Sequence, residues 1–168
     1  TRYADKSNPT RWYWPDAYVQ HAAVDFLKAA LGVNGLYPLH EPSPSLFPRK
    51  FDLIRVVSLF SHLPQIRTKQ WLVSLIDALE PGGVLVLSFH SSDLLNATQR
   101  ESLTDGILFL PRSESEVLSS LEYGTTYLSH EYLTREVQSI AGASIVGIYP
   151  FGLCEFQDLM VITRSKLD

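Results

Sequence analysis

The 168-residue sequence predicts an α/β fold whose sheet is mostly parallel and ends in a pair of antiparallel strands. Two short apolar runs, at 51–58 and 84–89, have the composition of buried strands, and an amphipathic helix pattern lies between them. Two strands joined by a helix form a βαβ unit, in which the strands run parallel. The final strand patterns, at 144–149 and 159–163, are joined by a short connection without a helix pattern, so we expect them to pair antiparallel.

The first helix is predicted at 19–31, where apolar residues recur at three- and four-residue spacing. This face contains Val19, Ala22, Ala23, Phe26, Leu27 and Ala30. Gly32 follows directly, and glycine just past the last turn is a common helix stop. Upstream, the aromatic segment 11–14 is a candidate short strand, and the proline- and serine-rich stretch 38–48 is expected to be a loop.

Two further helices have well-marked ends. The second begins after Leu63-Pro64, and we expect Pro81-Gly82-Gly83 to end it. Its apolar stripe contains Trp71, Leu72, Leu75, Ile76 and Leu79. The third is expected to be capped by Ser129, to end before Gly142 and to face inward with Tyr132, Leu133, Val137 and Ile140. In the less regular region between them, Ser113 and Glu116 have the spacing of a capping box.

The composition, with 45% hydrophobic and 19% charged residues, is that of an ordinary globular protein, and we expect a single domain over residues 1–168. A net charge of −4 without a basic run argues against binding nucleic acid through phosphate contacts. The lone Cys154 excludes an intrachain disulfide, and no apolar stretch approaches the roughly 20 residues that span a bilayer. Without a signal-peptide core we expect a cytoplasmic protein, and without an initiator Met we expect Thr1 to follow processing or to lie inside a longer reading frame.

Two segments resemble the class I S-adenosylmethionine-dependent methyltransferase domain. Phe51-Asp52-Leu53-Ile54, with the following Ser58-Leu59-Phe60-Ser61-His62-Leu63-Pro64, is similar to the family's fourth strand and the loop after it. Leu79-Glu80-Pro81-Gly82-Gly83-Val84 is similar to the turn that leads into its fifth strand, at a matching distance along the chain. Upstream, 19–26 looks like the helix after the family's second strand, and 33–36 looks like the approach to its third. The resemblance implies a Rossmann-like sheet, S-adenosylmethionine as cofactor and a small-molecule methyl acceptor.

The family's first strand and its glycine-rich cofactor loop have no counterpart in this sequence. Thr1-Arg2-Tyr3 looks like the helix that follows that loop, so the resemblance implies an N-terminally incomplete fold. The missing strand would lie between the second and fourth strands, and its loss would expose unpaired backbone edges. We therefore expect either a fragment of a longer protein, or a second copy or partner segment that completes the sheet.

The resemblance also implies residues of a cofactor site. A carboxylate at the end of the second strand would hold the ribose hydroxyls, and Asp16 is the candidate. Asp16 lies two residues before the expected position, where Tyr18 stands, and the alternative is an ordinary turn aspartate. Val57, Ser58 and Phe60 would lie beside the cofactor, at the carboxyl end of a parallel strand.

His62 and His90 are the candidate catalytic residues, because an imidazole near the end of a parallel strand can orient an acceptor or take its proton near neutral pH. The alternatives are that His62 packs the loop before the helix and that His90 is an exposed loop residue. The sequence has five histidines, but none of their spacings is that of a zinc site, so no metal is expected.

Methyl transfer from a sulfonium needs alignment of the methyl group with its acceptor and sometimes removal of a proton, so no dedicated nucleophile is expected. The leading hypothesis is S-adenosylmethionine-dependent methyl transfer to an unidentified acceptor. The alternative is a catalytically inactive methyltransferase-like module for binding or scaffolding, which the absent glycine-rich loop favours. A nicotinamide-dependent oxidoreductase is a weaker rival, because it would need a glycine-rich turn of its own.

Overall fold

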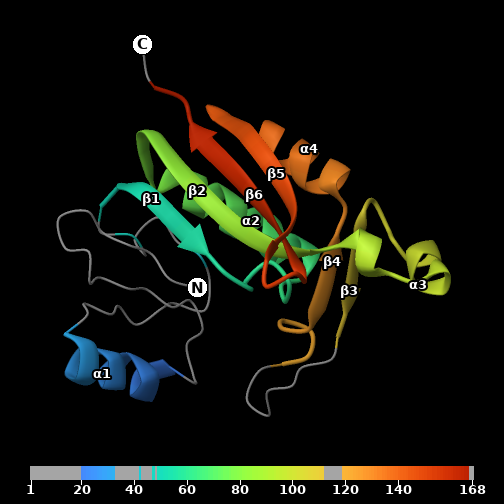
Figure 1. Ribbon diagram of the computed structural model, residues 1–168, viewed down its shortest axis with the longest axis horizontal. Helices are drawn as coiled ribbons and strands as arrows, with labels where there is room; N and C mark the ends of the chain where they lie inside the picture. The colour runs from blue at the N-terminus through green and yellow to red at the C-terminus, as the bar shows by residue number, and fades with distance from the viewer. Residues whose placement is uncertain (1–19, 33–41, 43–46, 48, 112–118, 167–168) are drawn as a thin grey trace.

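The computed structural model describes residues 20–32, 42, 47, 49–111 and 119–166 (Figure 1). Its helices are α1 (Gln20–Leu31), α2 (Gln65–Asp77), α3 (Ala97–Glu101) and α4 (His130–Gln138), with a 3-10 turn, η2, at Ser92–Leu94. Its strands are β1 (Phe51–Val56), β2 (Leu79–Ser91), β3 (Ile107–Leu110), β4 (Thr125–Leu128), β5 (Ala143–Leu153) and β6 (Gln157–Arg164). None of the helices within these ranges is long and apolar enough to cross a membrane.

The described strands form one mixed sheet around β2. β1 runs parallel to β2, with Ile54 opposite Leu85 and Val56 opposite Leu87. Along the other edge of β2, β6 runs antiparallel, and β5 then pairs antiparallel with β6. The predicted βαβ unit and the predicted antiparallel pair at the end of the chain are both confirmed. Within the described part of the chain, no strand pairs with the outer edge of β1.

β2 is much longer than its parallel neighbour, with 13 residues against six in β1. β1 pairs with β2 only as far as Leu87. β4 then takes over the same edge and pairs parallel with His90 and Ser91, while β3 pairs antiparallel with β4. The chain after β1 therefore leaves the sheet between the part of β2 that pairs with β1 and the part that pairs with β4.

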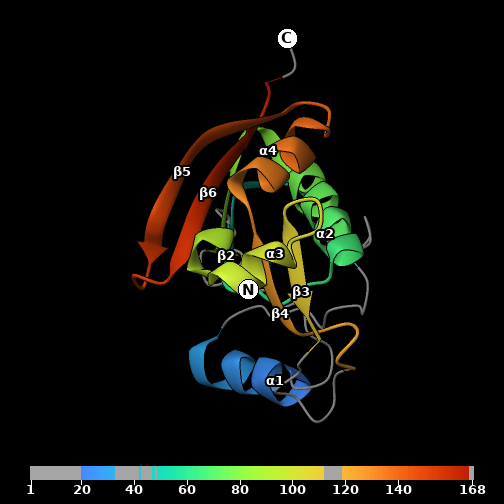
Figure 2. The ribbon, with the colours of Figure 1, turned by 90° about the vertical axis from the view of Figure 1, so that its right-hand side faces the viewer.

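Helices α2 and α4 cover one face of the sheet (Figures 1 and 2). The core lies between these layers, and many of its side chains have no exposed surface: Ile54, Val56, Leu72, Leu75, Leu85, Leu87, Phe89, Leu133, Val137, Met160 and Ile162. Each such side chain contributes roughly 1.5–3 kcal/mol by leaving water. On the opposite face near β1, Leu53 is 44% exposed.

The second predicted helix is confirmed as α2, with one correction. Its buried residues include Trp71, Leu72, Leu75 and Ile76. Leu79, which we placed on the same stripe, belongs to β2, because α2 ends at Asp77. Lys50 and Arg164 both donate hydrogen bonds to the Asp77 carbonyl, which satisfies a group that the helix end leaves open. The Pro-Gly-Gly segment therefore lies inside β2, where a Cβ on Gly83 would approach the Phe51 carbonyl oxygen to 2.8 Å.

The first and third predicted helices are also present. The Ser129 hydroxyl accepts a hydrogen bond from the Tyr132 N–H and caps α4, as predicted. Gly32 ends α1 with a φ of 63°. The predicted apolar face of α1 is partly exposed, since Phe26 is 66% exposed and Ala30 is also exposed. The segment 11–14 lies outside the described residues, and so does 38–48 apart from Pro42 and Phe47.

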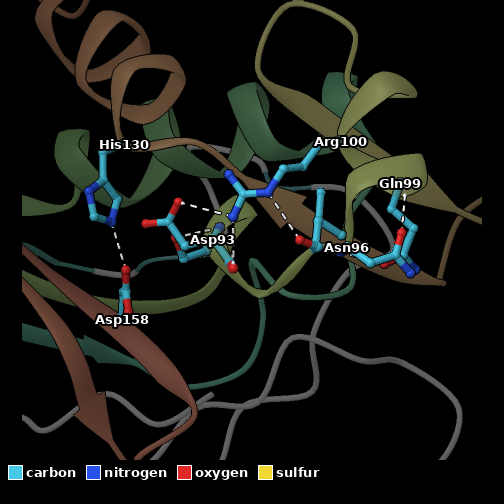
Figure 3. Close-up of polar contacts among 8 residues, drawn as sticks. Asp93, Asn96, Gln99, Arg100, His130 and Asp158 are labelled. Carbon is cyan, nitrogen blue, oxygen red and sulfur yellow. Dashed lines mark hydrogen bonds and ion pairs between the residues drawn. The ribbon is translucent and has the colours of Figure 1, made fainter.

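The region between β2 and β4 contains elements that the sequence analysis did not identify. α3 begins with a capping box, in which the Asn96 side chain accepts the Gln99 N–H and the Gln99 side chain accepts the Asn96 N–H. Arg100 then folds back and donates to the carbonyl of Asp93 at 2.9 Å (Figure 3). The capping box proposed for Ser113 and Glu116 lies outside the described residues.

The core predicts a sharp difference between neighbouring residues of β1. Val56→Asp places an unpaired carboxylate at a site with no exposed surface, and we expect it to lower the free energy of unfolding by more than about 3 kcal/mol. Arg55→Asp, on the exposed face of the same strand, should change it by about 0.5 kcal/mol or less. Urea unfolding measures both values, and similar losses for the two variants would contradict this assignment of the two faces.

Candidate functional site

The loop after β1 lies at the carboxyl end of the parallel strands β1 and β2, where open α/β sheets form their ligand sites. Val57 is half-buried there. Ser58 adopts a φ of 58°, a left-handed conformation that is uncommon for a residue with a side chain. Its N–H donates a 2.8 Å hydrogen bond to the Ser88 hydroxyl of β2, which holds the turn against the sheet.

Gln157, the first residue of β6, connects this loop to His90 of β2. Its side-chain oxygen accepts a 2.6 Å hydrogen bond from the Ser88 hydroxyl. Its amide nitrogen lies 3.1 Å from Ser58 Oγ and 3.3 Å from His90 Nε2. Ser58 is half-buried and the other three residues are buried. These four residues, Ser58, Ser88, His90 and Gln157, form one largely buried polar group that we call the Gln157 cluster.

The donors and acceptors of the Gln157 cluster assign the ring proton of His90. With the amide oxygen of Gln157 facing Ser88, its nitrogen faces His90 and can only donate. Nε2 of His90 therefore accepts this hydrogen bond, and the proton of the neutral imidazole is on Nδ1. Nδ1 is buried and has no hydrogen-bond partner among the described residues.

The surroundings of His90 favour its neutral form. The residue is 8% exposed, and burial lowers the pKa of its imidazole from the ordinary value of 6.5. Nearby His62 lowers this pKa further, because two positive charges would repel each other. The backbone of Thr126 lies near the ring and raises this pKa, which opposes both effects. It does not have the geometry of a hydrogen bond to Nδ1. At pH 7 His90 is thus a neutral ring that presents an unused N–H.

His62 enters the same region from the loop after β1, which β4 and the residues before it hold in place. The N–H of Gly124 donates to the His62 carbonyl at 3.0 Å, and the N–H of Thr126 donates to the Ser61 carbonyl at 2.8 Å. In return, His62 Nδ1–H donates a 2.8 Å hydrogen bond to the Gly124 carbonyl, because a carbonyl can only accept. Nε2 of neutral His62 therefore keeps its lone pair and can accept a proton.

Aromatic rings surround the two imidazoles. Tyr123 stacks on His62, with ring centroids 4.6 Å apart and planes at 9°. Tyr127 and Phe156 lie against His90 at centroid distances of 5.5 Å and 5.0 Å. The rings of His62 and His90 are themselves 6.4 Å apart. The site thus combines a proton acceptor, a hydrogen-bond donor and aromatic surfaces.

The predicted site residues have different positions in this arrangement. His62 and His90 lie side by side, and His90 belongs to β2 and is buried, so the alternative of an exposed loop histidine is wrong. Val57 and Ser58 follow β1, which ends at Val56, two residues earlier than predicted. Phe60 has no exposed surface and belongs to the core, so its side chain offers no contact to a ligand. Asp16 lies outside the described residues.

Sequence patterns did not identify Ser88, Gln157 or Phe156. A signal was present, because Gln157 and Asp158 are polar residues directly before the apolar run 159–163, and both are buried. Polar residues at the start of a buried strand are candidates for a side-chain network. Phe156 carried no such signal, since its contact with His90 depends on how the hairpin folds back.

A second polar contact lies on the helix-covered face, where His130 of α4 meets Asp158 of β6 (Figure 3). His130 Nε2 is 2.6 Å from Asp158 Oδ2, and Oδ1 accepts the Phe151 N–H at 2.9 Å. The Asp158 side chain is 4% exposed and that of His130 is 30% exposed. The carboxylate therefore ties the start of α4 to the β5–β6 hairpin, and it needs both partners because an unpaired buried carboxylate is costly.

A cavity of about 650 Å³ lies away from these imidazoles, at the amino end of β1 and against α2. Two lysines that line it already have partners: Lys69 Nζ is 3.2 Å from the Glu136 carboxylate, and Lys50 donates to the Asp77 carbonyl. We therefore place the candidate site at the carboxyl end of β1 and β2. No group of three or more His, Cys, Asp or Glu side chains within the described ranges could hold a metal ion.

No protein-family model matches this sequence, and no curated protein matches it. Many solved structures resemble its fold, among them three methyltransferases. An O-methyltransferase family protein from Burkholderia thailandensis is 15% identical, with a TM-score of 0.63 over 94% of this chain and 44% of that one. The O-methyltransferase NcsB1 from neocarzinostatin biosynthesis, in complex with S-adenosylmethionine and 2-hydroxy-5-methyl naphthoic acid, is 11% identical, with a TM-score of 0.58 over 92% and 41%. A S-adenosylmethionine-dependent methyltransferase from Clostridium acetobutylicum is 12% identical, with a TM-score of 0.55 over 91% and 74%.

These likenesses show the fold. The chain has the fold of class I S-adenosylmethionine-dependent methyltransferases, as the resemblance in its sequence implied. It spans less than half the length of the first two of these proteins, at 44% and 41%.

The lowered pKa of His90 predicts a pH dependence of stability. Above pH 6.5 both folded and unfolded chains carry a neutral His90, whereas below it the unfolded chain binds a proton that the folded chain excludes. Stability is therefore lost as the pH falls from 6.5 toward the lower folded pKa. We expect His90→Leu to make the plot of unfolding free energy against pH shallower in this range, by up to about 1.4 kcal/mol per pH unit. Identical slopes in urea unfolding of the two proteins would contradict the shift.

The contact between His130 and Asp158 predicts energetic coupling. Each of His130→Ala and Asp158→Ala should destabilise the protein, and the double variant should lose less than the sum of the two, by at least about 1 kcal/mol. Lys69→Ala and Glu136→Ala form a matched control, because their ion pair has a 45% exposed lysine and should couple by about 0.5 kcal/mol or less. Additive losses for His130 and Asp158 in urea unfolding would show that the contact does not stabilise the fold.

Proposed function

We propose that this chain transfers a methyl group from S-adenosylmethionine to a small-molecule acceptor, at the carboxyl end of β1 and β2. The observation that carries the proposal is the pairing of His62 and His90 at this end of a methyltransferase-like sheet, with ring centroids 6.4 Å apart. Fold alone would not support a reaction, because one fold serves many functions. The lone pair on His62 Nε2 and the N–H on His90 Nδ1 supply the groups that an acceptor with a hydroxyl needs.

The residues after β1 fit part of an adenosine-containing cofactor. Val57 offers a half-buried apolar side chain, and the half-buried Ser58 adds a hydroxyl at the same edge. When bound, S-adenosylmethionine supplies an activated methyl group. We propose that Val57 and Ser58 contact it and that Asp16 holds its ribose, and we leave Phe60 out because its side chain is fully buried.

His62 is the proposed proton acceptor of the reaction. Its Nδ1–H is committed to the Gly124 carbonyl, which orients the ring and leaves Nε2 to take a proton from the acceptor. The proposed role of His90 is to hold the acceptor, because its Nε2 is already engaged by Gln157. The two imidazoles therefore have different tasks in the same site.

A catalytically inactive module for binding or scaffolding is the second candidate. It is favoured by the outer edge of β1, which has no strand partner within the described residues. The sequence resemblance implies that the family's glycine-rich strand would pair there. A second copy or a partner segment could complete the sheet there. Two minor proposals accompany the first: that the chain is a single domain, supported by one sheet and one core, and that it works in the cytoplasm, supported by its lone cysteine.

A thermal-shift titration with S-adenosylhomocysteine tests cofactor binding directly. Ligand at about 100 times its Kd should add roughly 2.7 kcal/mol of stability. For a domain of this size that corresponds to a rise in Tm of roughly 5–10 °C. Homocysteine at the same concentrations is the control, because it lacks the adenosine that the proposed site would contact. A saturable rise supports the proposal, whereas a folded sample with no rise would favour the inactive module.

A further inference from the structure

Two features of His90 point to a bound molecule. Its buried Nδ1–H has no partner among the described residues, and such donors are rare because they lose water without compensation. The rings of Tyr127 and Phe156 flank the same imidazole at 5.5 Å and 5.0 Å. A single polar group among aromatic surfaces suits a flat, apolar molecule that carries an oxygen.

Phe156 belongs to the tip of the β5–β6 hairpin, which combines exposure with backbone strain. Phe151, Cys154 and Glu155 have φ values of 54°, 53° and 55°, although none of them is glycine. Conformations of this kind cost free energy and gather at ligand-binding segments. Phe156 is 52% exposed, so its ring can move away from His90 without opening the core.

Hydrogen bonds on both sides of Phe156 hold this hairpin tip in place. The Phe151 N–H donates to Asp158 at 2.9 Å, and the same buried carboxylate contacts His130 of α4. Gln157, next to Asp158, contacts His90 itself. These contacts keep Phe156 beside His90 while leaving its exposed ring free to adapt to a ligand.

We propose that His62, His90, Tyr127 and Phe156 form the acceptor site and that this site takes a flat aromatic compound bearing a hydroxyl group. The inference rests on the proposed methyl transfer. The aromatic part of the compound packs between Tyr127 and Phe156, and His90 Nδ1–H donates to its hydroxyl oxygen. That oxygen forms a bond to the methyl carbon, the carbon–sulfur bond breaks with its electron pair remaining on sulfur, and the hydroxyl proton passes to His62 Nε2.

Three probes with one ring skeleton test the substrate class: 2-naphthol, naphthalene and the saturated alcohol 2-decalol. Ligand-detected NMR titrations in the presence of S-adenosylhomocysteine give their affinities. We expect 2-naphthol to bind at least ten times more tightly than either of the others, since naphthalene lacks the hydroxyl and 2-decalol is not flat. Equal affinity for 2-naphthol and naphthalene, or for 2-naphthol and 2-decalol, overturns the proposed class.

Variants of the hairpin tip test the place of binding. Phe156→Ala and Phe156→Leu should each weaken 2-naphthol binding at least fivefold, because neither keeps a flat ring. Phe151→Ala is the matched control, since Phe151 lies in the same hairpin and is 55% exposed. It should leave the affinity unchanged, and thermal melts verify that all three variants fold. Equal weakening by Phe151→Ala and Phe156→Ala would contradict the proposal that the Phe156 ring contacts the bound compound.

The position of the ring proton on His90 can be measured directly. Nitrogen-15 NMR distinguishes the two neutral histidine tautomers, and we expect the proton of His90 on Nδ1. A proton on Nε2 would remove the donor on which the inference depends. In His90→Leu the preference for 2-naphthol over naphthalene should fall below twofold.

The same samples separate this inference from the proposed function. A thermal shift with S-adenosylhomocysteine but no binding of 2-naphthol would overturn the acceptor assignment alone. Loss of the S-adenosylhomocysteine shift would overturn the proposed methyl transfer, and the acceptor assignment with it, whatever 2-naphthol does. If both bind, mass spectrometry should detect 2-methoxynaphthalene when S-adenosylmethionine is supplied, and its formation should be lost in His62→Ala while 2-naphthol binding persists.

Discussion

The unequal lengths of β1 and β2 determine most of what surrounds the candidate site. Backbone groups of a buried strand need hydrogen-bond partners, and β1 pairs with β2 only as far as Leu87. The end of β2 therefore pairs with β4, at His90 and Ser91. The segment that ends in β4 also binds the loop after β1 through backbone bonds to Ser61 and His62. These backbone hydrogen bonds place His62 next to His90 independently of any side-chain contact between the two residues.

The two imidazoles show how hydrogen bonds give one residue type two chemical characters. Both rings are held through one nitrogen, but the partner of His62 is a carbonyl and that of His90 is an amide nitrogen. A carbonyl accepts and so requires a proton on the histidine, whereas an amide nitrogen donates and so requires a lone pair. The free nitrogen is consequently an acceptor in His62 and a donor in His90. Burial and the neighbouring ring keep the pKa of His90 low, which preserves its neutral form.

Sequence patterns predicted the elements that depend on local rules and missed those that depend on distant partners. The α2 stripe, the Ser129 cap and the antiparallel pair β5–β6 follow from periodicity and turn chemistry, and the structure contains all three. Leu79 was misplaced, because helical spacing continues past Asp77 while the chain itself turns into β2. β3 and β4 are only four residues each, which is too short for a periodic pattern to stand out. Likewise, the tautomer of His90 depends on Gln157, 67 residues away, and no local pattern can reveal it.

The site divides into two parts that depend on different sections of the sheet. The proposed acceptor part uses residues of β2 and β4 and of the β5–β6 hairpin. The proposed cofactor part lies after β1, whose outer edge has no strand partner within the described part of the chain. Ser58 connects the two parts, because it follows β1 and yet bonds to Ser88 and Gln157. Ser58 and the Gln157 cluster therefore connect the end of β1 to the proposed acceptor side of the site.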